Sequence, residues 1–505
     1  MSAGRQEGEG AVAVSSVAVS PFLVPRPLPD LVVDLPRREV RGDPGVPISD
    51  LSYRSQDAAL GSLFFCVPGA TLDGHDFAAE AVSKGAVALA VERWLPVEAT
   101  QVLVPSVREA MGPVSAAFYD RPAQGMTMVG VTGTNGKTTT TYVLESVFRA
   151  ADLVPGVVGT TGVRIGGRPA PALRTTPEAP DLQRLLAEMR DEGVGAVAME
   201  VSSHGLDQHR VGGIRFTCAV FTNLTQDHLD YHASMDAYFA AKARLFTRER
   251  SERAVVNVDD PAGRRLRDLD LPTITFGIDD EGAEVRATDV RATDEGIAFR
   301  VDDIEIRSPL RGRFNVENCL AAIATARALG IEDSVAVRGI EALRGVPGRV
   351  EPVDVGQDFL VMVDYAHTPA SLESVLLAAR SLTAARVIVV FGCGGDRDRA
   401  KRPFMGRVAA ANADLTVITS DNPRSEDPDS IIREIESGAT GAGAYVIESD
   451  RRTAIHTAVA EARRGDVVVI AGKGHETYQE LADRTIAFDD RAVASEEIRA
   501  VRGAG

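Results

Sequence analysis

The sequence predicts an α/β protein of three domains, in which the central domain has a mostly parallel sheet. Three observations lead to this prediction. Short apolar runs alternate with helical patterns, a glycine-rich loop joins one such run to a helix, and 505 residues correspond to about three domains. The C-terminal domain is expected to be Rossmann-like and doubly wound, and the N-terminal domain is expected to be a small α/β unit.

The first 35 residues are expected to be a disordered tail. They are mixed in charge, only mildly apolar and then rich in proline, a composition typical of extended chain. A small domain is predicted over residues 36–121. Within it, strands at 63–67 and 86–91 flank a helix at 77–84.

The central domain is expected over residues 122–346. Its expected strands lie at 126–131, 196–201 and 219–222, and its expected helices lie at 138–150 and 181–192. Alternation of this kind indicates parallel strands covered by helices. Short alternating patterns at 284–306 then predict an antiparallel extension, which is followed by a helix at 316–329.

The C-terminal domain is expected over residues 347–505. Its predicted strands are 360–363, 387–391, 415–419 and 467–470, and helical patterns lie between them. This order is typical of a doubly wound sheet, in which ligands gather at the carboxyl ends of the strands.

Composition and charge exclude several classes of function. The formal net charge is −17, so we expect no nucleic-acid partner and no binding to anionic membranes, both of which need a basic face. No apolar run reaches the roughly 18 residues of a membrane span. The four cysteines are far apart and form no CxxC pair, which argues against a zinc site and fits a cytoplasmic protein.

A phosphate-binding loop is predicted where the strand at 126–131 meets the next helix. The sequence there is GVTGTNGKTT, in which Lys137 would reach the terminal phosphates and Thr138 would ligate Mg²⁺. The strict GxxxxGK[ST] spacing would need glycine at Val131, so the match is to a compact GxxGKT form. The alternative is a glycine-rich turn without a ligand. The residues predicted to contact ATP are Gly133, Thr134, Asn135, Gly136, Lys137, Thr138 and Thr139.

The compact GTNGKTT form resembles the Mur ligases and their relatives, the folylpolyglutamate synthetases. The resemblance covers nearly all of the chain after the tail. It implies one domain for a UDP-sugar, a central ATPase and a C-terminal domain for the incoming amino acid. The implied activity is ATP-dependent amide formation through an acyl phosphate in peptidoglycan biosynthesis, with two Mg²⁺ ions. The sequence leaves the oligomeric state open, and we expect a monomer.

The resemblance also assigns the metal and activation residues. Glu200 lies in EVSSHG and His228 in TNLTQDHLDYH, each after an apolar strand, and the family pattern makes both ligands of the second Mg²⁺. Lys242 aligns with the lysine that the family carbamylates. Taken alone, these residues could be a solvated strand end, a core or capping histidine and a surface lysine. Further family matches around the nucleotide are Asn315, Asn318, Arg349, Asp364 and His367.

The UDP-muramoyl dipeptide is expected to contact two parts of the chain. By resemblance its contacts are Thr175, Thr176, Ser202, Gln208 and Arg210 in the central domain, and Ser55, Ala70, Thr71 and Leu72 in the first. The first domain departs from the family pattern, because Arg54-Ser55-Gln56 replaces the usual D-S-R. Arg174 likewise stands where some relatives carry Asn.

The amino-acid site is expected in the third domain. Asp421-Asn422-Pro423-Arg424 resembles the diaminopimelate-adding branch, and Arg424 could pair bidentately with a distal carboxylate that lysine lacks. Without that resemblance, DNP is an ordinary loop turn. The remaining predicted contacts are Arg397, Gly472 and Glu476, of which Glu476 would bind the distal ammonium.

Two other functions fit parts of the sequence. A folylpolyglutamate synthetase would lack the separate UDP-sugar domain and the DNPR segment. A non-catalytic nucleotide-binding regulator would have lost Lys137, Glu200 or His228, and all three are present.

Overall fold

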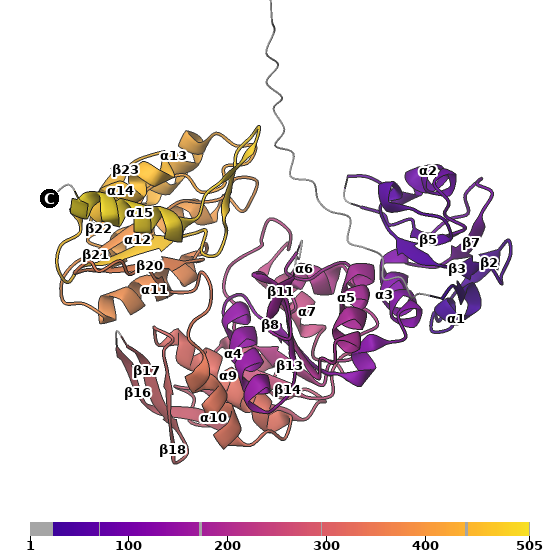
Figure 1. The fold of residues 1–505 in the computed structure, drawn as a ribbon, viewed down its shortest axis with the longest axis horizontal. Coiled ribbons are helices and arrows are strands. Elements are labelled where there is room, and N and C mark those ends of the chain that lie inside the picture. The colour runs from indigo at the N-terminus through magenta and orange to yellow at the C-terminus, as the bar shows by residue number, and fades with distance from the viewer. Residues whose placement is uncertain (1–23, 70, 171–173, 294, 440–442, 504–505) are drawn as a thin grey trace, which may run out of the picture. The chain divides into compact units, whose positions relative to one another are not determined.

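The computed structural model describes residues 24–69, 71–170, 174–293, 295–439 and 443–503. The chain divides into two compact units, of which the first ends at Phe118 and the second begins at Tyr119. The α/β fold class is confirmed (Figure 1). Within the described ranges, no helix has the length and apolar character needed to cross a bilayer.

The first unit contains a mostly parallel sheet. Its elements are β1 Arg26–Pro27, α1 Leu28–Val32, β2 Glu39–Arg41, β3 Pro47–Ile48, β4 Asp50–Ser52, η1 Ser55–Asp57, β5 Ser62–Phe65, η2 Gly74–Phe77, α2 Ala78–Ser83, β6 Ala88–Val91, β7 Thr100–Leu103 and α3 Val107–Phe118. The sheet order is β2-β7-β6-β5-β4, in which only the β2–β7 pair is antiparallel. This arrangement matches the small α/β unit expected from the sequence.

The predicted tail over residues 1–35 is too long. Residues 1–23 lie outside the described residues, but β1 pairs with β3 and α1 follows directly. Leu28, Leu31 and Leu35 are buried. The prolines misled the prediction, because one of them occupies the first turn of α1, where its missing N–H costs nothing.

The central part of the second unit is one long sheet. Its elements are η3 Pro122–Gly125, β8 Thr127–Thr132, α4 Lys137–Ala150, β9 Pro155–Gly159, β10 Gly162–Ile165, β11 Arg168–Ala170, α5 Ala179–Asp191, β12 Ala196–Glu200, α6 Ser203–Asp207, β13 Cys218–Phe221, α7 Met235–Ala243, β14 Ala254–Asn257, α8 Pro261–Arg265, β15 Thr273–Gly277, β16 Val285–Thr293, β17 Gly296–Val301, β18 Ile304–Ser308, α9 Phe314–Ala328 and α10 Asp333–Ala342. The strand order is β11-β10-β9-β12-β8-β13-β14-β15-β16-β17-β18. In this order the neighbouring strands β9, β12, β8, β13, β14, β15 and β16 pair in parallel, whereas β10 pairs with β9 antiparallel. Strands β16, β17 and β18 form the expected antiparallel extension.

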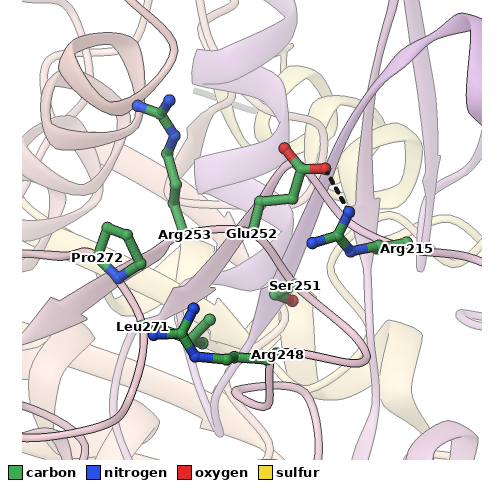
Figure 2. A pocket seen from close by; sticks show the side chains of 7 residues that line it. All are labelled: Arg215, Arg248, Ser251, Glu252, Arg253, Leu271 and Pro272. Carbon is green, nitrogen blue, oxygen red and sulfur yellow. Dashed lines mark hydrogen bonds and ion pairs between the residues drawn. The ribbon is translucent and has the colours of Figure 1, made fainter.

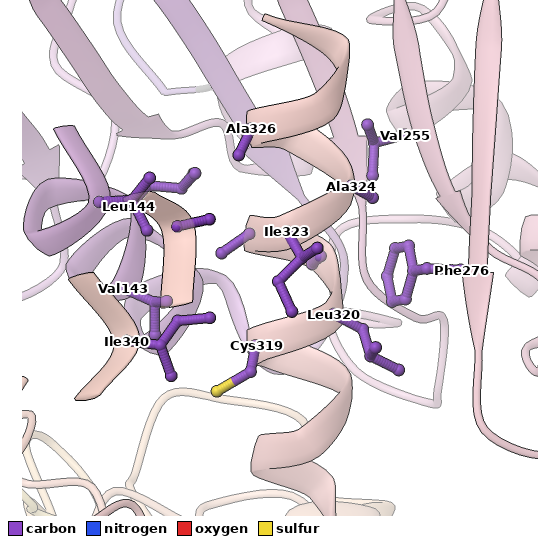
Figure 3. Close-up of a cluster of buried hydrophobic side chains, with 14 of the residues drawn as sticks. Val143, Leu144, Val255, Phe276, Cys319, Leu320, Ile323, Ala324, Ala326 and Ile340 are labelled. Carbon is purple, nitrogen blue, oxygen red and sulfur yellow. The ribbon is translucent and has the colours of Figure 1, made fainter. Parts of the chain in front are cut away.

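A buried core holds the phosphate-loop helix in place. Helix α9 lies between α4 and α10 on one side and the sheet on the other (Figure 3). The contacting side chains include Val143 and Leu144 of α4, Leu320 and Ile323 of α9, Ile340 of α10 and Phe276 of β15. Burial of this apolar surface stabilises the start of α4 at the edge of the sheet.

The C-terminal part contains a second sheet, which has six strands and is covered by helices on both faces (Figure 1). Its elements are β19 Glu351–Pro352, β20 Leu360–Asp364, α11 Pro369–Ser381, β21 Val387–Phe391, α12 Lys401–Asn412, β22 Leu415–Ile418, α13 Pro428–Ala439, β23 Ala444–Ile447, α14 Arg451–Glu461, β24 Val467–Ala471, β25 Tyr478–Glu480, β26 Thr485–Ala487 and α15 Asp490–Gly503. The order is β19-β20-β24-β21-β22-β23, and only β19–β20 is antiparallel.

The predicted domain boundaries at 121/122 and 346/347 stay predictions. Both of them lie inside the second compact unit, which begins at Tyr119. The parallel registers do explain why predicted site residues meet, because carboxyl ends of neighbouring strands lie at one edge. Glu200 pairs with Val131 in one sheet, and Asp364 pairs with Ala471 in the other.

Candidate functional site

The phosphate loop connects β8 to α4 as predicted. Gly133 and Gly136 have φ of +150° and +86°, and a Cβ on Gly133 would lie 1.9 Å from Thr222 Oγ1. Glycine is therefore required at Gly133. Lys137 Nζ donates to the carbonyls of Gly133 and Thr134 at 3.0 and 2.8 Å, so its ammonium lies over the loop.

Glu200 joins the phosphate loop to the next strand of the sheet. This carboxylate is only 1% exposed, and its Oε1 accepts hydrogen bonds from Thr138 Oγ1 at 2.8 Å and Thr160 N at 2.9 Å. Thr160 Oγ1 donates to Oε2 at 2.9 Å. Arg349 Nη2 donates to Thr138 Oγ1 at 3.0 Å, which brings the third predicted domain to the same point.

Lys242 is a buried lysine, not a solvated one. It is 1% exposed, and its Nζ donates to Gly133 O at 2.7 Å, the carbonyl that Lys137 also uses. Burial, followed by the charge of Lys137, holds the pKa of Lys242 well below its ordinary value, although Asp227 opposes the shift. Burial at this position thus shifts the balance toward the neutral amine.

His228 lies in a strained turn beside other ionisable groups. Its φ is +55°, an uncommon backbone conformation for a residue other than glycine. Burial lowers the pKa of His228 to about 3 despite the nearby Asp227 carboxylate, whose Oδ2 lies 3.4 Å from Nε2. His367 Nε2 lies 3.9 Å from the same oxygen, and burial lowers its pKa to about 4.

The remaining predicted nucleotide residues support the loop from two directions. Asn318 Oδ1 accepts a hydrogen bond from Thr140 Oγ1 at 3.3 Å, and its amide donates to Asn315 Oδ1 at 2.8 Å. Asp364 is buried and accepts from the backbone N–H groups of Val350 and Ala366. Asp364 thus positions the segment that carries Arg349. Thr139 is buried within α4.

The donor set fits a magnesium ion that is held partly by phosphate. Over the described part of the chain, no group of three or more His, Cys, Asp or Glu side chains could hold a metal by itself. Mg²⁺ commonly uses one or two protein oxygens together with substrate phosphates. The hydroxyl of Thr138 and the carboxylate of Glu200 lie 2.8 Å apart at the phosphate loop and supply such oxygens.

The predicted dipeptide contacts of the central domain gather next to Glu200. Thr176 Oγ1 donates to Glu200 O at 2.9 Å and accepts from Ser202 N at 3.1 Å. Arg210 donates to Thr176 O at 3.0 Å and to Gln208 Oε1 at 2.6 Å. Thr175 Oγ1 lies 3.1 Å from Thr160 Oγ1, which completes the group. Arg174 pairs with Glu178 at 2.7 Å, as Arg210 does at 3.2 Å.

The predicted uridine contacts belong to the first unit. Ser55 Oγ donates to Glu80 Oε2 at 2.8 Å. Thr71 and Leu72 are exposed, and Ala70 lies outside the described residues. These assignments stay predictions.

The predicted amino-acid site surrounds a lysine that the sequence analysis did not select. Lys473 is 0% exposed, and its Nζ donates to Asn422 Oδ1 at 2.8 Å and to Glu476 Oε2 at 3.3 Å. Asp421 Oδ1 lies 3.8 Å away. A Cβ on Gly472, whose φ is +118°, would lie 2.4 Å from Asp421 Oδ2, so this approach needs glycine.

Arg424 and Arg397 occupy different surroundings. Arg424 has a φ of +51°, and it donates from Nε to Glu480 Oε2 at 2.9 Å and from Nη1 to Gly395 O at 2.8 Å. Pro423, the residue before it, packs its carbonyl against Gly395. Arg397 donates to the carbonyl of Asp396 at 2.9 Å.

Three family models match successive parts of the chain. The Mur ligase family catalytic domain matches residues 47–119, the Mur ligase middle domain matches 131–326, and the Mur ligase glutamate ligase domain matches 348–474. The chain is also 49% identical over 462 residues to the UDP-N-acetylmuramoyl-L-alanyl-D-glutamate–2,6-diaminopimelate ligase of Geobacillus thermodenitrificans, covering 89% of this chain and 94% of that protein. The chain belongs to the Mur ligase family.

Two other comparisons extend this result for the present Mur ligase. The ligase of the same name from Solibacter usitatus is 46% identical, with 95% of this chain and 97% of that protein covered. A solved structure with that name superposes with a TM-score of 0.67 and 32% identity, covering 95% of this chain and 100% of the other. The likeness therefore includes the first unit, which the folylpolyglutamate synthetase alternative would lack.

Sequence reasoning missed several residues of this Mur ligase site. Thr160 was not selected, although both its N–H and its hydroxyl bind Glu200. Lys473 and His475 lie within GKGHE, a segment from which the sequence predicts only Gly472 and Glu476 as amino-acid contacts. No pattern in the sequence points to Thr160, but an ionisable residue within a recognised segment is a signal that could have identified the other two.

A separate cavity of about 480 Å³ lies away from these residues. It is lined by Arg215, Arg248, Ser251, Glu252, Arg253, Leu271 and Pro272 (Figure 2). These residues lie near the amino ends of β13 to β15, opposite the phosphate-loop edge. Arg215 is paired with Glu252 at 3.0 Å, and Arg248 is paired with Asp270 at 2.6 Å. The cavity contains none of the predicted site residues.

Proposed function

We propose that this Mur ligase joins diaminopimelate to the D-glutamate of UDP-N-acetylmuramoyl-L-Ala-D-Glu at the expense of ATP, in peptidoglycan synthesis. The observation that carries the proposal is the meeting of Lys137, Thr138 and Glu200 at one sheet edge, with Arg349 of the amino-acid domain on Thr138. The names of the most similar relatives support this choice of substrates.

The reaction needs two steps on one carboxylate. The substrate carboxylate attacks the γ-phosphorus of ATP, and the bond to the β-phosphate oxygen breaks to give ADP and an acyl phosphate. The amine of diaminopimelate then attacks the acyl carbon, loses a proton and displaces phosphate. Both steps bring anionic groups together, so positive charge and hydrogen-bond donors are required.

In this proposal the chain supplies those donors. Lys137 moves from the loop carbonyls to the terminal phosphates, and Arg349 contributes a second cation beside Thr138. Thr138, Glu200 and His228 would hold Mg²⁺, which would supply positive charge to screen the reacting anions. The neutral imidazole of His228 is the form that can ligate a metal.

Carbamylation of Lys242 is part of the proposal. A neutral amine forms a bond from Nζ to the carbon of CO₂ and releases a proton, which leaves an anionic carbamate. Lys242 is buried beside Lys137 and shares an acceptor with it, so an anion at this position would be attracted to the Lys137 ammonium. The carbamate would also fit next to Mg²⁺, where an ammonium would not.

The proposal places the enzyme in the cytoplasm as a monomer. The four cysteines are free and buried, which fits a reducing compartment.

The direct test of the proposed function is phosphate release by the purified protein with the UDP-muramoyl dipeptide, ATP and each candidate amino acid. Diaminopimelate should give the highest rate and a tripeptide product by mass. Equal rates with lysine or glutamate would contradict the proposed substrate.

Arg424 is expected to select diaminopimelate over lysine. Loss of one partner from a buried carboxylate–guanidinium pair typically costs about 3–5 kcal/mol. For Arg424→Ala, kcat/KM for diaminopimelate should therefore fall by on the order of a hundredfold or more, since ~1.4 kcal/mol is a factor of ten. Lysine has no distal carboxylate, so its low kcat/KM should stay the same or rise.

Two control variants separate selectivity from structure. Glu480→Gln removes the charge that Arg424 Nε contacts in this structure but keeps an acceptor. Its selectivity should stay close to that of the unaltered enzyme. Arg397→Ala should lower kcat/KM for both amino acids if Arg397 holds the carboxylate that they share. An equal fall for both substrates in Arg424→Ala would identify Arg424 as a shared contact and refute its role in selection.

A further inference from the structure

His475 connects the amino-acid segment to the central domain. Its Nε2 lies 3.1 Å from the carbonyl oxygen of Thr160. A carbonyl only accepts, so Nε2 carries the hydrogen and donates. In the neutral ring Nδ1 is then unprotonated, and it is buried without a hydrogen-bond partner among the described residues. The hydrogen bond to Thr160 is therefore the polar contact that orients the ring.

The backbone around His475 is rigidly packed within the C-terminal domain. A Cβ on Gly348 would lie 2.1 Å from His475 N, and a Cβ on Gly474 would lie 2.7 Å from Tyr365 Cβ. The rings of Tyr365 and His475 have centroids 5.2 Å apart, and Arg491 Nη2 lies 3.5 Å from the carbonyl oxygen of His475. Such close packing leaves the imidazole few alternative positions.

Thr160 passes the contact on to the nucleotide site. While its carbonyl accepts from His475, its N–H and hydroxyl donate to the two oxygens of Glu200 at 2.9 Å each. Glu200 in turn accepts from Thr138 of the phosphate loop. On the other side, His475 directly precedes Glu476, which belongs to the predicted amino-acid site, and follows Lys473, which donates to Glu476, by two residues.

We infer that His475 is a positioning residue that couples amino-acid binding to the Glu200 site through the carbonyl of Thr160. The inference rests on the proposed function, because it uses the same two sites. Contact of the amino acid with Glu476 is transmitted through the closely packed backbone to His475, and from His475 to Thr160 and the orientation of both Glu200 oxygens. Coupling of this kind is reciprocal, so each ligand should tighten the binding of the other.

The test measures this coupling by binding, without turnover. Affinity for a non-hydrolysable ATP analogue with Mg²⁺ is measured by calorimetry in the presence and absence of diaminopimelate. The unaltered protein should bind the analogue more tightly when diaminopimelate is present. His475→Ala and His475→Phe lack the donor, so the ratio of the two affinities should fall to about one. His475→Gln is the matched control, because its amide N–H₂ group can reach as far as Nε2 and should keep the ratio.

Activity separates positioning from a general structural role. His475→Ala should lower kcat by on the order of ten- to a hundredfold, the effect expected when a positioning contact is lost. Its thermal midpoint should change little, and His475→Gln should restore most of kcat. An unaltered protein without coupling, or His475→Ala with full coupling, would overturn the inference. Absence of diaminopimelate-dependent phosphate release in the unaltered protein would instead overturn the proposed function.

Discussion

Replacing Lys137 with alanine is expected to lower ATP-dependent ligation by on the order of a thousandfold or more, because a preorganised charge on a transferring phosphoryl group contributes several kcal/mol. Among the described residues, Lys137 Nζ donates hydrogen bonds to the carbonyls of Gly133 and Thr134 in its own loop. Its loss should therefore leave the core around α4 intact. The measurement is steady-state phosphate release together with the thermal midpoint of the variant.

A matched control for Lys137→Ala is Arg248→Ala. This variant removes one positive charge from the same unit, at an exposed residue of the separate cavity. Its activity and thermal midpoint should stay near those of the unaltered protein. Normal turnover by a folded Lys137→Ala protein would show that the loop does not bind the reacting phosphates.

Lys242→Ala is expected to be nearly inactive although folded, because it removes the group that becomes the carbamate. The structure strengthens the chemical basis of this expectation. Lys242 is buried, and its Nζ lies 4.5 Å from the centroid of the Tyr238 ring. Burial, together with the charge of Lys137, lowers the pKa of Lys242. A small carboxylic acid such as acetate or propionate should diffuse into the space left by the side chain and restore part of the activity.

Rescue gives this prediction its specificity. Acetate should raise the activity of Lys242→Ala and leave that of Lys137→Ala unchanged, because Lys137 is expected to supply positive charge. Mass spectrometry of the unaltered protein under CO₂ should find one added carboxyl group on the peptide that contains Lys242. Full activity of Lys242→Ala without acid, or an unmodified lysine in the active protein, would contradict carbamylation.

Much of the candidate site could be predicted from the sequence, because its residues occupy characteristic places relative to regular elements. Lys137 and Thr138 begin a helix after an apolar strand, and Glu200 ends another strand. Their convergence follows from the parallel register between β12 and β8. Thr160 could not be selected this way, because its role depends on a loop after β9 that meets Glu200 across 40 positions of sequence.

The buried charges show the same limit. Lys242 and Lys473 are both lysines within helical or loop sequence, and lysines in such positions are usually solvated. Only the packed structure shows that Lys242 shares the carbonyl of Gly133 with Lys137, and that Lys473 lies between Asn422 and Glu476. The error over residues 26–35 has a similar origin, since the burial of Leu28 depends on contacts within the first unit.

The sequence by itself determined the α/β class, the phosphate loop, the family and the segments around the site. These features are local, because hydrophobic periodicity, glycines at a tight loop and short motifs are all readable within a few residues. Tertiary structure alone decided which ionisable side chains are buried and which segments meet, such as His475 with Thr160, 315 positions apart. Burial and hydrogen bonding between distant segments set the charge and orientation of a group, and neither is encoded in its neighbours along the chain.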